Sequence, residues 1–386
     1  MPSDSNKDIS KKLENIYIYL NNNYQQYNRI GALNGLAGIA LFQSYYEIKF
    51  NIQQSHSLKT IDYCINKINE ENLPSTYCNG VAGFAWLLHH LEENQFVSET
   101  EFSETLSILD TYLENELSKY IINNNYDFLH GALGYIFYFL KRSKHPEHYK
   151  KQISALFSNL PEIYKTITHH ELSKIAMREM TNGRLENKLH FGLAHGISSI
   201  IAILCLCYEK GYFKEQSKEW IEKFILFLSQ YEMVQDSLSL FPMWIDLQTG
   251  KKSFSSLSWC SGDIGIAIAL TKASQIVESK ILSTILTAIL EKSFQRTYND
   301  KALIKNYGIC HGYFGVARIF SRIYNDTLSE KYKETSLFWL NKGIDSLTMT
   351  KDSPMSILNG LAGAGLVLID FRLQEINSWD ECLLIS

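Results

Sequence analysis

The hydrophobic positions along this chain alternate between two kinds of segment. In residues 220–228, Trp220, Phe224 and Leu228 recur at helical spacing with polar residues between them, which is typical of an amphipathic helix. In residues 266–270 every position is apolar, which predicts a helix that is buried on all sides. Further amphipathic segments are found at 11–20, 58–68, 104–120, 282–294 and 332–347.

A short turn of small residues precedes each buried segment. The residue before the first glycine of the turn is Asn, His or Ser every time, and we expect it to cap the following helix by accepting a backbone N–H bond. Self-similarity at a roughly constant period is the signature of a repeat architecture. The first glycines of the seven repeats are Gly35, Gly80, Gly131, Gly196, Gly262, Gly312 and Gly360.

Each repeat therefore predicts an outer amphipathic helix followed by an inner buried helix. An open stack of repeats needs polar capping repeats at its ends, whereas both ends of this chain resemble the middle. We therefore predict an all-α fold, a closed (α/α)7 toroid of seven helix pairs, in a single domain over residues 1–386. The low proline content, six in 386 residues, suits a helical protein because proline breaks helix interiors.

Two of the repeats are longer than the others. Residues 141–189 are polar and carry four histidines, so we expect an insertion, in the form of a small subdomain, between repeats three and four. Residues 233–258 contain an alternating stretch followed by a turn at Gly250. This pattern predicts a β-hairpin before repeat five.

Composition narrows the class of protein. The chain is 45% hydrophobic and 20% charged, with a net charge of −4 and no long basic run, which argues against a nucleic-acid partner. The N-terminus is polar, without the apolar core of a signal peptide. No apolar run reaches the roughly 20 residues that a membrane span needs. We expect a cytoplasmic protein without a transmembrane segment, in which the seven cysteines form no structural disulfide.

Two cysteines occupy matching places in successive repeats. Cys260 and Cys310 each lie two residues before the first glycine of repeats five and six, and His311 follows Cys310. Neighbouring repeats bring equivalent positions side by side, so two thiolates and one imidazole can converge. These ligands suit zinc, with a fourth position open as in a catalytic site. The alternative is that cysteines pack as small apolar residues, which is our interpretation of Cys64, Cys78, Cys205, Cys207 and Cys382.

A histidine and a carboxylate lie in the two preceding repeats. His195, in repeat four, can donate or accept a proton near neutral pH, and Asp127 lies four residues before Gly131 in repeat three. The alternatives are a hydrogen-bonded or capping histidine and an ordinary loop carboxylate. With Cys260 and Cys310 these residues fall on repeats three to six, a contiguous arc that favours one common site.

Four motifs together resemble the lanthionine synthetase C-like family, the cyclases of lanthipeptide biosynthesis. The resemblance covers roughly residues 10–370. It implies an (α/α)-toroid with a central zinc ion. The motifs are Trp259-Cys260-Ser261-Gly262, Cys310-His311-Gly312-Tyr313-Phe314-Gly315, Leu193-Ala194-His195-Gly196, and Asp127 placed four residues before Gly131.

The resemblance also implies an activity and partners. Cys260, Cys310 and His311 match the zinc ligands of the family, and His195 and Asp127 match its candidate acid/base residues. The implied reaction adds cysteine thiols of a dehydrated precursor peptide, made of leader and core, to dehydroalanine or dehydrobutyrine, giving lanthionine or methyllanthionine rings. A dehydratase and an exporter at the inner face of the membrane are the implied partner proteins.

The chain departs from the family at three positions. Ser261 stands where the family usually has tyrosine, Ser199 where it usually has glycine, and Ser256 where some bacterial members have arginine. These departures concern the surroundings of the acid/base residues rather than the zinc ligands.

Three alternatives to a peptide cyclase remain. A related enzyme would add glutathione or another free thiol to dehydrated residues, and a catalytically weak scaffold would only bind peptide in a modification complex. An (α/α)-barrel sugar hydrolase would need two carboxylates flanking a cleft, whereas the matched positions here hold cysteine and histidine.

Overall fold

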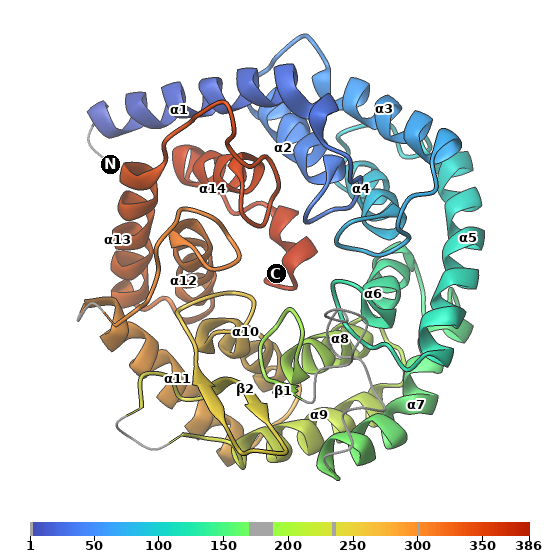
Figure 1. Cartoon of the computed structure of the whole chain (residues 1–386), viewed down its shortest axis with the longest axis vertical. Coiled ribbons are helices and arrows are strands. Elements are labelled where there is room, and N and C mark those ends of the chain that lie inside the picture. The colour runs from blue at the N-terminus through green and yellow to red at the C-terminus, as the bar shows by residue number, and fades with distance from the viewer. Residues whose placement is uncertain (1–2, 170–187, 234–236, 299–300) are drawn as a thin grey trace. The chain divides into compact units, whose positions relative to one another are not determined.

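Figure 1 shows the computed structural model of the chain, which describes residues 3–169, 188–233, 237–298 and 301–386. Contacts between residues divide the chain into two compact units, and each is considered by itself. Unit 1 consists of Met1–Thr111, Lys305–Arg322 and Ser336–Ser386, and unit 2 of Tyr112–Ile304 and Ile323–Thr335.

The predicted alternation of amphipathic and buried helices is confirmed over the described residues. The amphipathic helices are α1 Ser3–Asn23, α3 His56–Glu70, α5 Ser103–Ile122, α7 Lys150–Thr168, α9 Lys214–Ser229, α11 Lys280–Tyr298 and α13 Glu330–Ser346. The buried helices are α2 Leu36–Lys49, α4 Val81–Glu93, α6 Ala132–Arg142, α8 Ile197–Glu209, α10 Asp263–Ser274, α12 Tyr313–Thr327 and α14 Leu361–Leu373.

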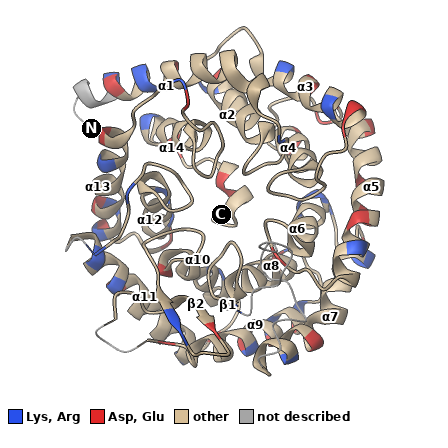
Figure 2. Cartoon of the chain, in the orientation of Figure 1, with Lys and Arg blue, Asp and Glu red and all other residues tan. Residues whose placement is uncertain are grey.

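The two kinds of helix differ in which residues they bury. In α3 the buried residues include Ser57, Ile61 and Cys64, which lie on one face at helical spacing. In α8 nearly every residue is buried. Figure 2 shows the same contrast in unit 2, where charged residues follow α9 and are nearly absent from α8. Helix α8 can therefore be covered on every side at little cost in desolvated charge.

The expected side-chain caps are wrong for six of the seven turns. The N-cap residue of these buried helices is the first glycine itself, and no side chain accepts a hydrogen bond there. At the start of α2, α4, α6, α8 and α14 a backbone carbonyl seven residues earlier in the chain accepts instead, as when Val81 N–H donates to Pro74 O at 3.0 Å. A Cβ atom on Gly80 would lie 1.8 Å from this oxygen. The close approach of the loop explains why the repeat requires glycine.

In unit 1 the turns are joined to one another by main-chain hydrogen bonds. Ile309 N–H of repeat six donates to Leu358 O of repeat seven at 2.8 Å. Leu358 N–H donates to Leu33 O of repeat one at 3.2 Å. Ala32 N–H in turn donates to Tyr77 O of repeat two at 3.2 Å. The first and last repeats are therefore direct neighbours, and α14 packs against both α1 and α2 (Figure 1).

In unit 2 the buried helices form a row with amphipathic helices packed against it. Helix α8 contacts α6 and α10, while α9 contacts α7, α8 and α11. A small antiparallel sheet of order β1-β2-β3 accompanies these helices (Figure 1). Its strands are β1 Lys188–His190, β2 Pro242–Asp246 and β3 Lys252–Phe254.

The two long repeats contain different structures. The predicted hairpin is confirmed as β2 and β3, with β1 as an additional strand that the sequence did not predict. Within 141–189, residues 150–168 form α7, and residues 170–187 lie outside the described part of the chain. The inserted subdomain and the single domain over 1–386 stay predictions.

The C-terminal segment of unit 1 is held by a buried ionic network. It contains the short helix η3 Ser378–Leu383. Asp380 accepts hydrogen bonds from Arg318 Nε at 2.7 Å and from Arg322 Nη2 at 2.6 Å. Arg318 also pairs with Asp370 at 2.7 Å. Both arginines belong to α12, so this helix is fixed to the C-terminal segment. Over the described residues, no helix is both long and apolar enough to cross a membrane.

Candidate functional site

The seven cysteines separate into two groups by burial. Cys260 and Cys310 are partly exposed, and the other five are buried. Burial raises the pKa of the thiols of four of the buried cysteines, because a low-dielectric interior disfavours the thiolate. A thiolate is the form that binds metal and attacks electrophiles. These four buried thiols are therefore unsuited to binding a metal ion or attacking an electrophile. The four cysteines are Cys64, Cys205, Cys207 and Cys382.

Cys260 lies in unit 2, on the turn that precedes α10. Its carbonyl accepts a hydrogen bond from Ala194 N–H at 3.1 Å, so the turn is tied directly to the turn that carries His195. Gly192 faces the same carbonyl, and a Cβ there would come within 2.2 Å of it. Cys260 Sγ lies 3.6 Å from Ser261 Oγ. A hydroxyl thus lies beside the sulfur.

Cys310 and His311 lie in unit 1, on the turn that precedes α12. Cys310 is partly exposed and His311 is exposed. The N–H groups of Ile309 and Cys310 both donate to Leu358 O at 2.8 Å. This turn is therefore held by the main chain of repeat seven.

The three predicted zinc ligands are divided between the two units: Cys260 belongs to unit 2, and Cys310 and His311 belong to unit 1. Each of them offers a metal-binding atom, a sulfur or a ring nitrogen. Two sulfur ligands and one imidazole are a donor set for zinc.

His195 and Asp127, both in unit 2, form a hydrogen-bonded pair. His195 Nδ1 lies 2.7 Å from Asp127 Oδ2. The Asp127 side chain is fully buried, whereas that of His195 is 22% exposed. Asp127 Oδ1 also accepts the His130 N–H at 2.7 Å, and the rings of His130 and His195 are stacked, with centroids 6.3 Å apart. The carboxylate thus fixes the imidazole so that Nε2 is the ring nitrogen turned away from Asp127.

The residues before the turn glycines link neighbouring turns instead of capping helices. Asn34 Nδ2 donates to Asn79 Oδ1 at 3.2 Å in unit 1, and the His130–His195 stack occupies the same two positions in unit 2. Side chains at this position therefore meet their counterparts in the next repeat. In both pairs the repeat thus brings the polar side chains that precede the turn glycine next to one another.

Two charged residues next to the Cys260 turn were not predicted from the sequence. Asp263 and Arg296 are almost completely buried and lie 3.8 Å apart, measured from Oδ2 to Nη1. One signal was available, because the residue after the first glycine is charged in repeat five and uncharged in the other six. No comparable signal marks Arg296, which lies in an ordinary amphipathic helix.

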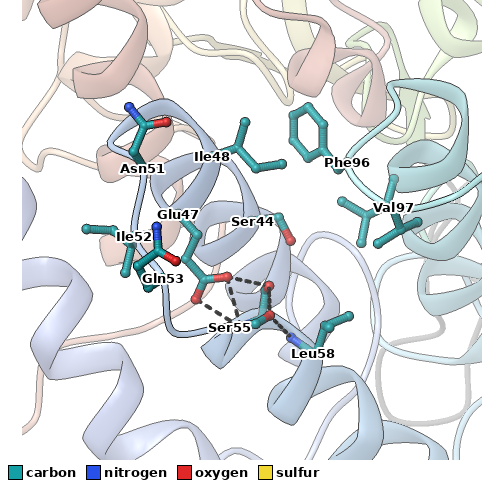
Figure 3. A pocket seen from close by; sticks show the side chains of 12 residues that line it. Ser44, Glu47, Ile48, Asn51, Ile52, Gln53, Ser55, Leu58, Phe96 and Val97 are labelled. Carbon is teal, nitrogen blue, oxygen red and sulfur yellow. Dashed lines mark hydrogen bonds between the residues drawn. The ribbon is translucent and has the colours of Figure 1, made fainter.

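A separate cavity of about 390 Å³ lies at the opposite end of α2 from its glycine turn. Figure 3 shows Glu47 at its wall, with Ile48, Leu58 and Phe96 nearby. A helix of this length spans about 20 Å at 1.5 Å per residue, so the cavity is well separated from the turn of repeat one. It contains none of the predicted site residues.

Comparison with known proteins decides the family. The pattern described as lanthionine synthetase C-like protein matches residues 28–384. This chain belongs to the lanthionine synthetase C-like family. The nisin biosynthesis protein NisC of Lactococcus lactis subsp. lactis is 26% identical over 380 residues, which cover 91% of this chain and 88% of that protein.

A solved structure extends the likeness to the fold. The structure of a nisin cyclase matches this lanthionine synthetase C-like protein with a TM-score of 0.79 and 22% identity, and covers 98% of each chain. The predicted fold class, an all-α (α/α)7 toroid, is confirmed. In unit 1, repeat seven contacts repeat one directly.

Proposed function

We propose that this protein is a zinc-dependent peptide cyclase. It joins cysteine thiols of a dehydrated precursor peptide to dehydroalanine or dehydrobutyrine, and forms lanthionine or methyllanthionine thioether rings. The observation that carries the proposal is the backbone bond between Ala194 and Cys260, which ties a partly exposed cysteine to the turn that bears the His195–Asp127 pair. Membership of the lanthionine synthetase C-like family supports the same reaction.

In this proposal zinc is held by Cys260 from unit 2 and by Cys310 and His311 from unit 1. Three protein ligands leave one of four tetrahedral positions for the substrate sulfur. The donor set fits, since these cysteines are the two that burial does not exclude. When bound, zinc would lower the pKa of a coordinated thiol so that it is a thiolate at neutral pH.

His195 is the proposed proton donor. When the thiol adds to the alkene, sulfur bonds to the β-carbon, the π electrons pass to an enolate, and the α-carbon takes up one proton. This proton balances the one that the thiol has lost. The Asp127 carboxylate against Nδ1 stabilises the imidazolium form of His195. His195 can then deliver the proton from Nε2, as a general acid does.

Zinc content tests the metal site. Elemental analysis of the wild type should give about one zinc per chain, and Cys310→Ala should retain little, because two remaining ligands bind zinc weakly. Cys78→Ala is the matched control, since Cys78 occupies the same place in repeat two but is buried. It should keep its zinc. A well-folded wild type without zinc would contradict the proposal.

Activity on a dehydrated peptide separates the remaining alternatives. The substrate is a peptide with one cysteine and one dehydroalanine, and free thiols are counted by mass spectrometry after alkylation. A cyclase removes the thiol without changing the mass of the peptide. A gain of one glutathione, when glutathione is supplied, would favour the intermolecular thiol addition. Bound zinc without either product would favour a peptide-binding scaffold.

The same chemistry implies partner proteins. The alkene arises only after a hydroxy amino acid of the precursor has lost water, so a dehydratase must act first. We propose that the dehydratase and an exporter of the mature peptide assemble with this protein at the inner face of the membrane. Co-purification of the three proteins from membranes, with and without the precursor peptide, tests the assembly.

A further inference from the structure

A buried ion pair lies directly behind the Cys260 turn and has no role in the proposed chemistry. Asp263 is the first residue of α10 and Arg296 belongs to α11. The side chain of Asp263 is inaccessible and that of Arg296 is 3% exposed. Two ionic groups that are removed from water in this way are costly unless further hydrogen bonds satisfy them. Their additional partners therefore show what the pair holds together.

Asp263 holds the segment that enters the hairpin. Its Oδ2 accepts the Leu240 N–H at 2.7 Å, and its Oδ1 accepts the Phe241 N–H at 3.0 Å. These residues immediately precede β2. The carboxylate thus joins the start of the hairpin to the start of α10.

Arg296 holds the segment that leaves the hairpin. Its Nη2 donates to Ser255 O at 2.5 Å, directly after β3, and its Nε donates to Lys301 O at 3.1 Å. The segment 255–263 is therefore fixed at both ends: the Arg296 guanidinium binds Ser255 O at its start, and the Asp263 carboxylate lies at its end. Cys260 lies between these two fixed ends.

Four polar atoms around this segment are buried and have no hydrogen-bond partner among the described residues. They are Arg296 Nη1 and the Oγ atoms of Ser255, Ser258 and Ser293. Buried polar groups in native proteins are almost always hydrogen-bonded, and internal water serves where no protein group does. Internal water is therefore expected to hydrogen-bond to these atoms.

We propose that Asp263 and Arg296 are positioning residues for Cys260, and that internal water hydrogen-bonds to the four buried polar atoms that have no described partner. The proposal rests on the proposed function only for the role of Cys260 as a zinc ligand. A metal ligand is effective when its supporting groups hold it in place before the metal arrives. The pair supplies this support through both ends of residues 255–263.

The test is the reactivity of each cysteine in the metal-free full-length chain. The protein is treated with EDTA and then alkylated with iodoacetamide, and the rate at each cysteine is followed by mass spectrometry of digests. Asp263→Asn and Arg296→Lys should each accelerate alkylation of Cys260 by about tenfold, because lost charge-assisted hydrogen bonds favour local opening. Cys310, in the same molecule, should change by less than about twofold.

Glu47→Gln is the matched control. Glu47 is also a buried carboxylate that accepts two backbone N–H bonds from another segment, those of His56 at 2.7 Å and Ser57 at 3.1 Å. Its substitution costs similar interactions in unit 1 and should leave the alkylation of Cys260 unchanged.

Two results would overturn the proposal. One is an unchanged Cys260 rate in both folded variants. The other is equal acceleration at the buried Cys205 and Cys207, which would show general destabilisation instead of a local effect. Neither result depends on zinc. A wild type that binds no zinc, in which Asp263→Asn still exposes Cys260 selectively, would refute the proposed function and leave the positioning role supported.

A second measurement connects the pair to the metal. Competition with a chromophoric chelator should show a zinc affinity about 10- to 100-fold lower in Asp263→Asn, as is typical when a group that supports a ligand is removed. The affinity of Glu47→Gln should equal that of the wild type. An unchanged affinity in Asp263→Asn would overturn the positioning role.

Discussion

The turns of Cys260 and Cys310 follow one plan but are held in place by different means. The Cys310 turn is joined to repeat seven by the main chain, because Ile309 and Cys310 both donate to Leu358 O, and Asn306 Oδ1 accepts a local bond from Gly308 N–H at 2.9 Å. The Cys260 turn also makes a main-chain bond, to Ala194, but residues 255–263 around it depend on two charged side chains as well. One half of the proposed metal site is thus built from the repeat itself, and the other from residues specific to one repeat.

This difference indicates where the protein has been specialised. Main-chain bonds between turns form in any repeat whose loops have the required shape, so they say little about function. Side-chain clamps require particular residues, and they are found beside the turn that adjoins His195. We infer that the Cys260 side, with the proposed acid/base pair, is the part of the proposed site at which small structural changes have the largest chemical effect.

The largest predicted effect is the loss of the proposed acid/base pair, His195 and Asp127. His195→Ala should slow cyclisation by about 10²- to 10⁴-fold, the usual contribution of a general acid, and should leave zinc content unchanged. Asp127→Asn should slow it less, because the imidazole remains present. The rates are measured by the thiol-counting assay on one dehydrated peptide.

Zinc content serves as the control for this prediction. If His195→Ala loses zinc together with activity, His195 is a ligand or a structural residue, and the contrast between the two turns would no longer involve proton transfer.

The next largest effect concerns the helix that follows the Cys310 turn. Arg318→Ala leaves Asp370 and Asp380 without their shared partner, and breaking a buried ion pair typically costs about 3–5 kcal/mol. Urea denaturation monitored by circular dichroism measures the loss. The folded fraction should still bind zinc, because the Cys310 turn is held by Leu358 O.

An exposed ion pair gives the reference value. Lys331→Ala removes the pair with Glu291, in which both side chains are at least 40% exposed, and should cost less than about 1 kcal/mol. Equal losses in the two variants would contradict the role assigned to the buried network.

A smaller effect should depend on pH. Burial raises the pKa of Asp380, but the guanidinium groups of Arg318 and Arg322 outweigh it and lower the pKa to about 2. A carboxyl whose pKa is depressed in the folded state stabilises the fold above its unfolded pKa, and this contribution is lost as pH falls through the folded value. Asp380→Asn should remove about 2 kcal/mol of such stability at pH 7, and the loss should shrink between about pH 4 and pH 2.

Urea titrations of Asp380→Asn and the wild type at several pH values measure this change. Burial raises the pKa of the neighbouring Asp370 to about 6, so Asp370→Asn should show the opposite trend: its stability relative to the wild type should rise as pH increases from about 4 to 6. If the stability of both variants relative to the wild type changed with pH in the same direction, the opposite pKa shifts of Asp370 and Asp380 would be contradicted.

The smallest effect should follow from the hydroxyl beside Cys260. Ser261→Ala removes the contact between Ser261 Oγ and Cys260 Sγ at 3.6 Å, which is weak because sulfur is a poor hydrogen-bond partner. Zinc affinity should fall by about threefold, well below the 10- to 100-fold change typical of stronger supporting bonds. A larger loss would mean that Ser261 supports the sulfur as strongly as Asp263 supports the turn.

The repeats made much of the fold predictable. Buried and amphipathic helices follow from hydrophobic periodicity, and Cys260 and Cys310 could be compared because they share a place in the repeat. The cap of each buried helix could not be predicted, because it depends on a backbone carbonyl brought close by the loop. Strand β1 was not predicted either, because three residues are too few to show the alternation of apolar and polar positions that indicates a strand. Arg296 was missed because a charge on an amphipathic helix normally faces solvent, and only tertiary packing buries this one.

The hydrogen bond between Leu358 and Leu33 has a consequence for biosynthesis. It joins the last repeat to the first, so helix α2 has one of its packing partners, α14, near the far end of the sequence. While the chain is being synthesised, the apolar surface of α2 that packs against α14 stays exposed to solvent until repeat seven leaves the ribosome. Contacts so distant in sequence also slow folding. Unit 1 therefore gains its full structure only after repeat seven has been synthesised, and a chaperone that shields α2 during this interval should raise the yield.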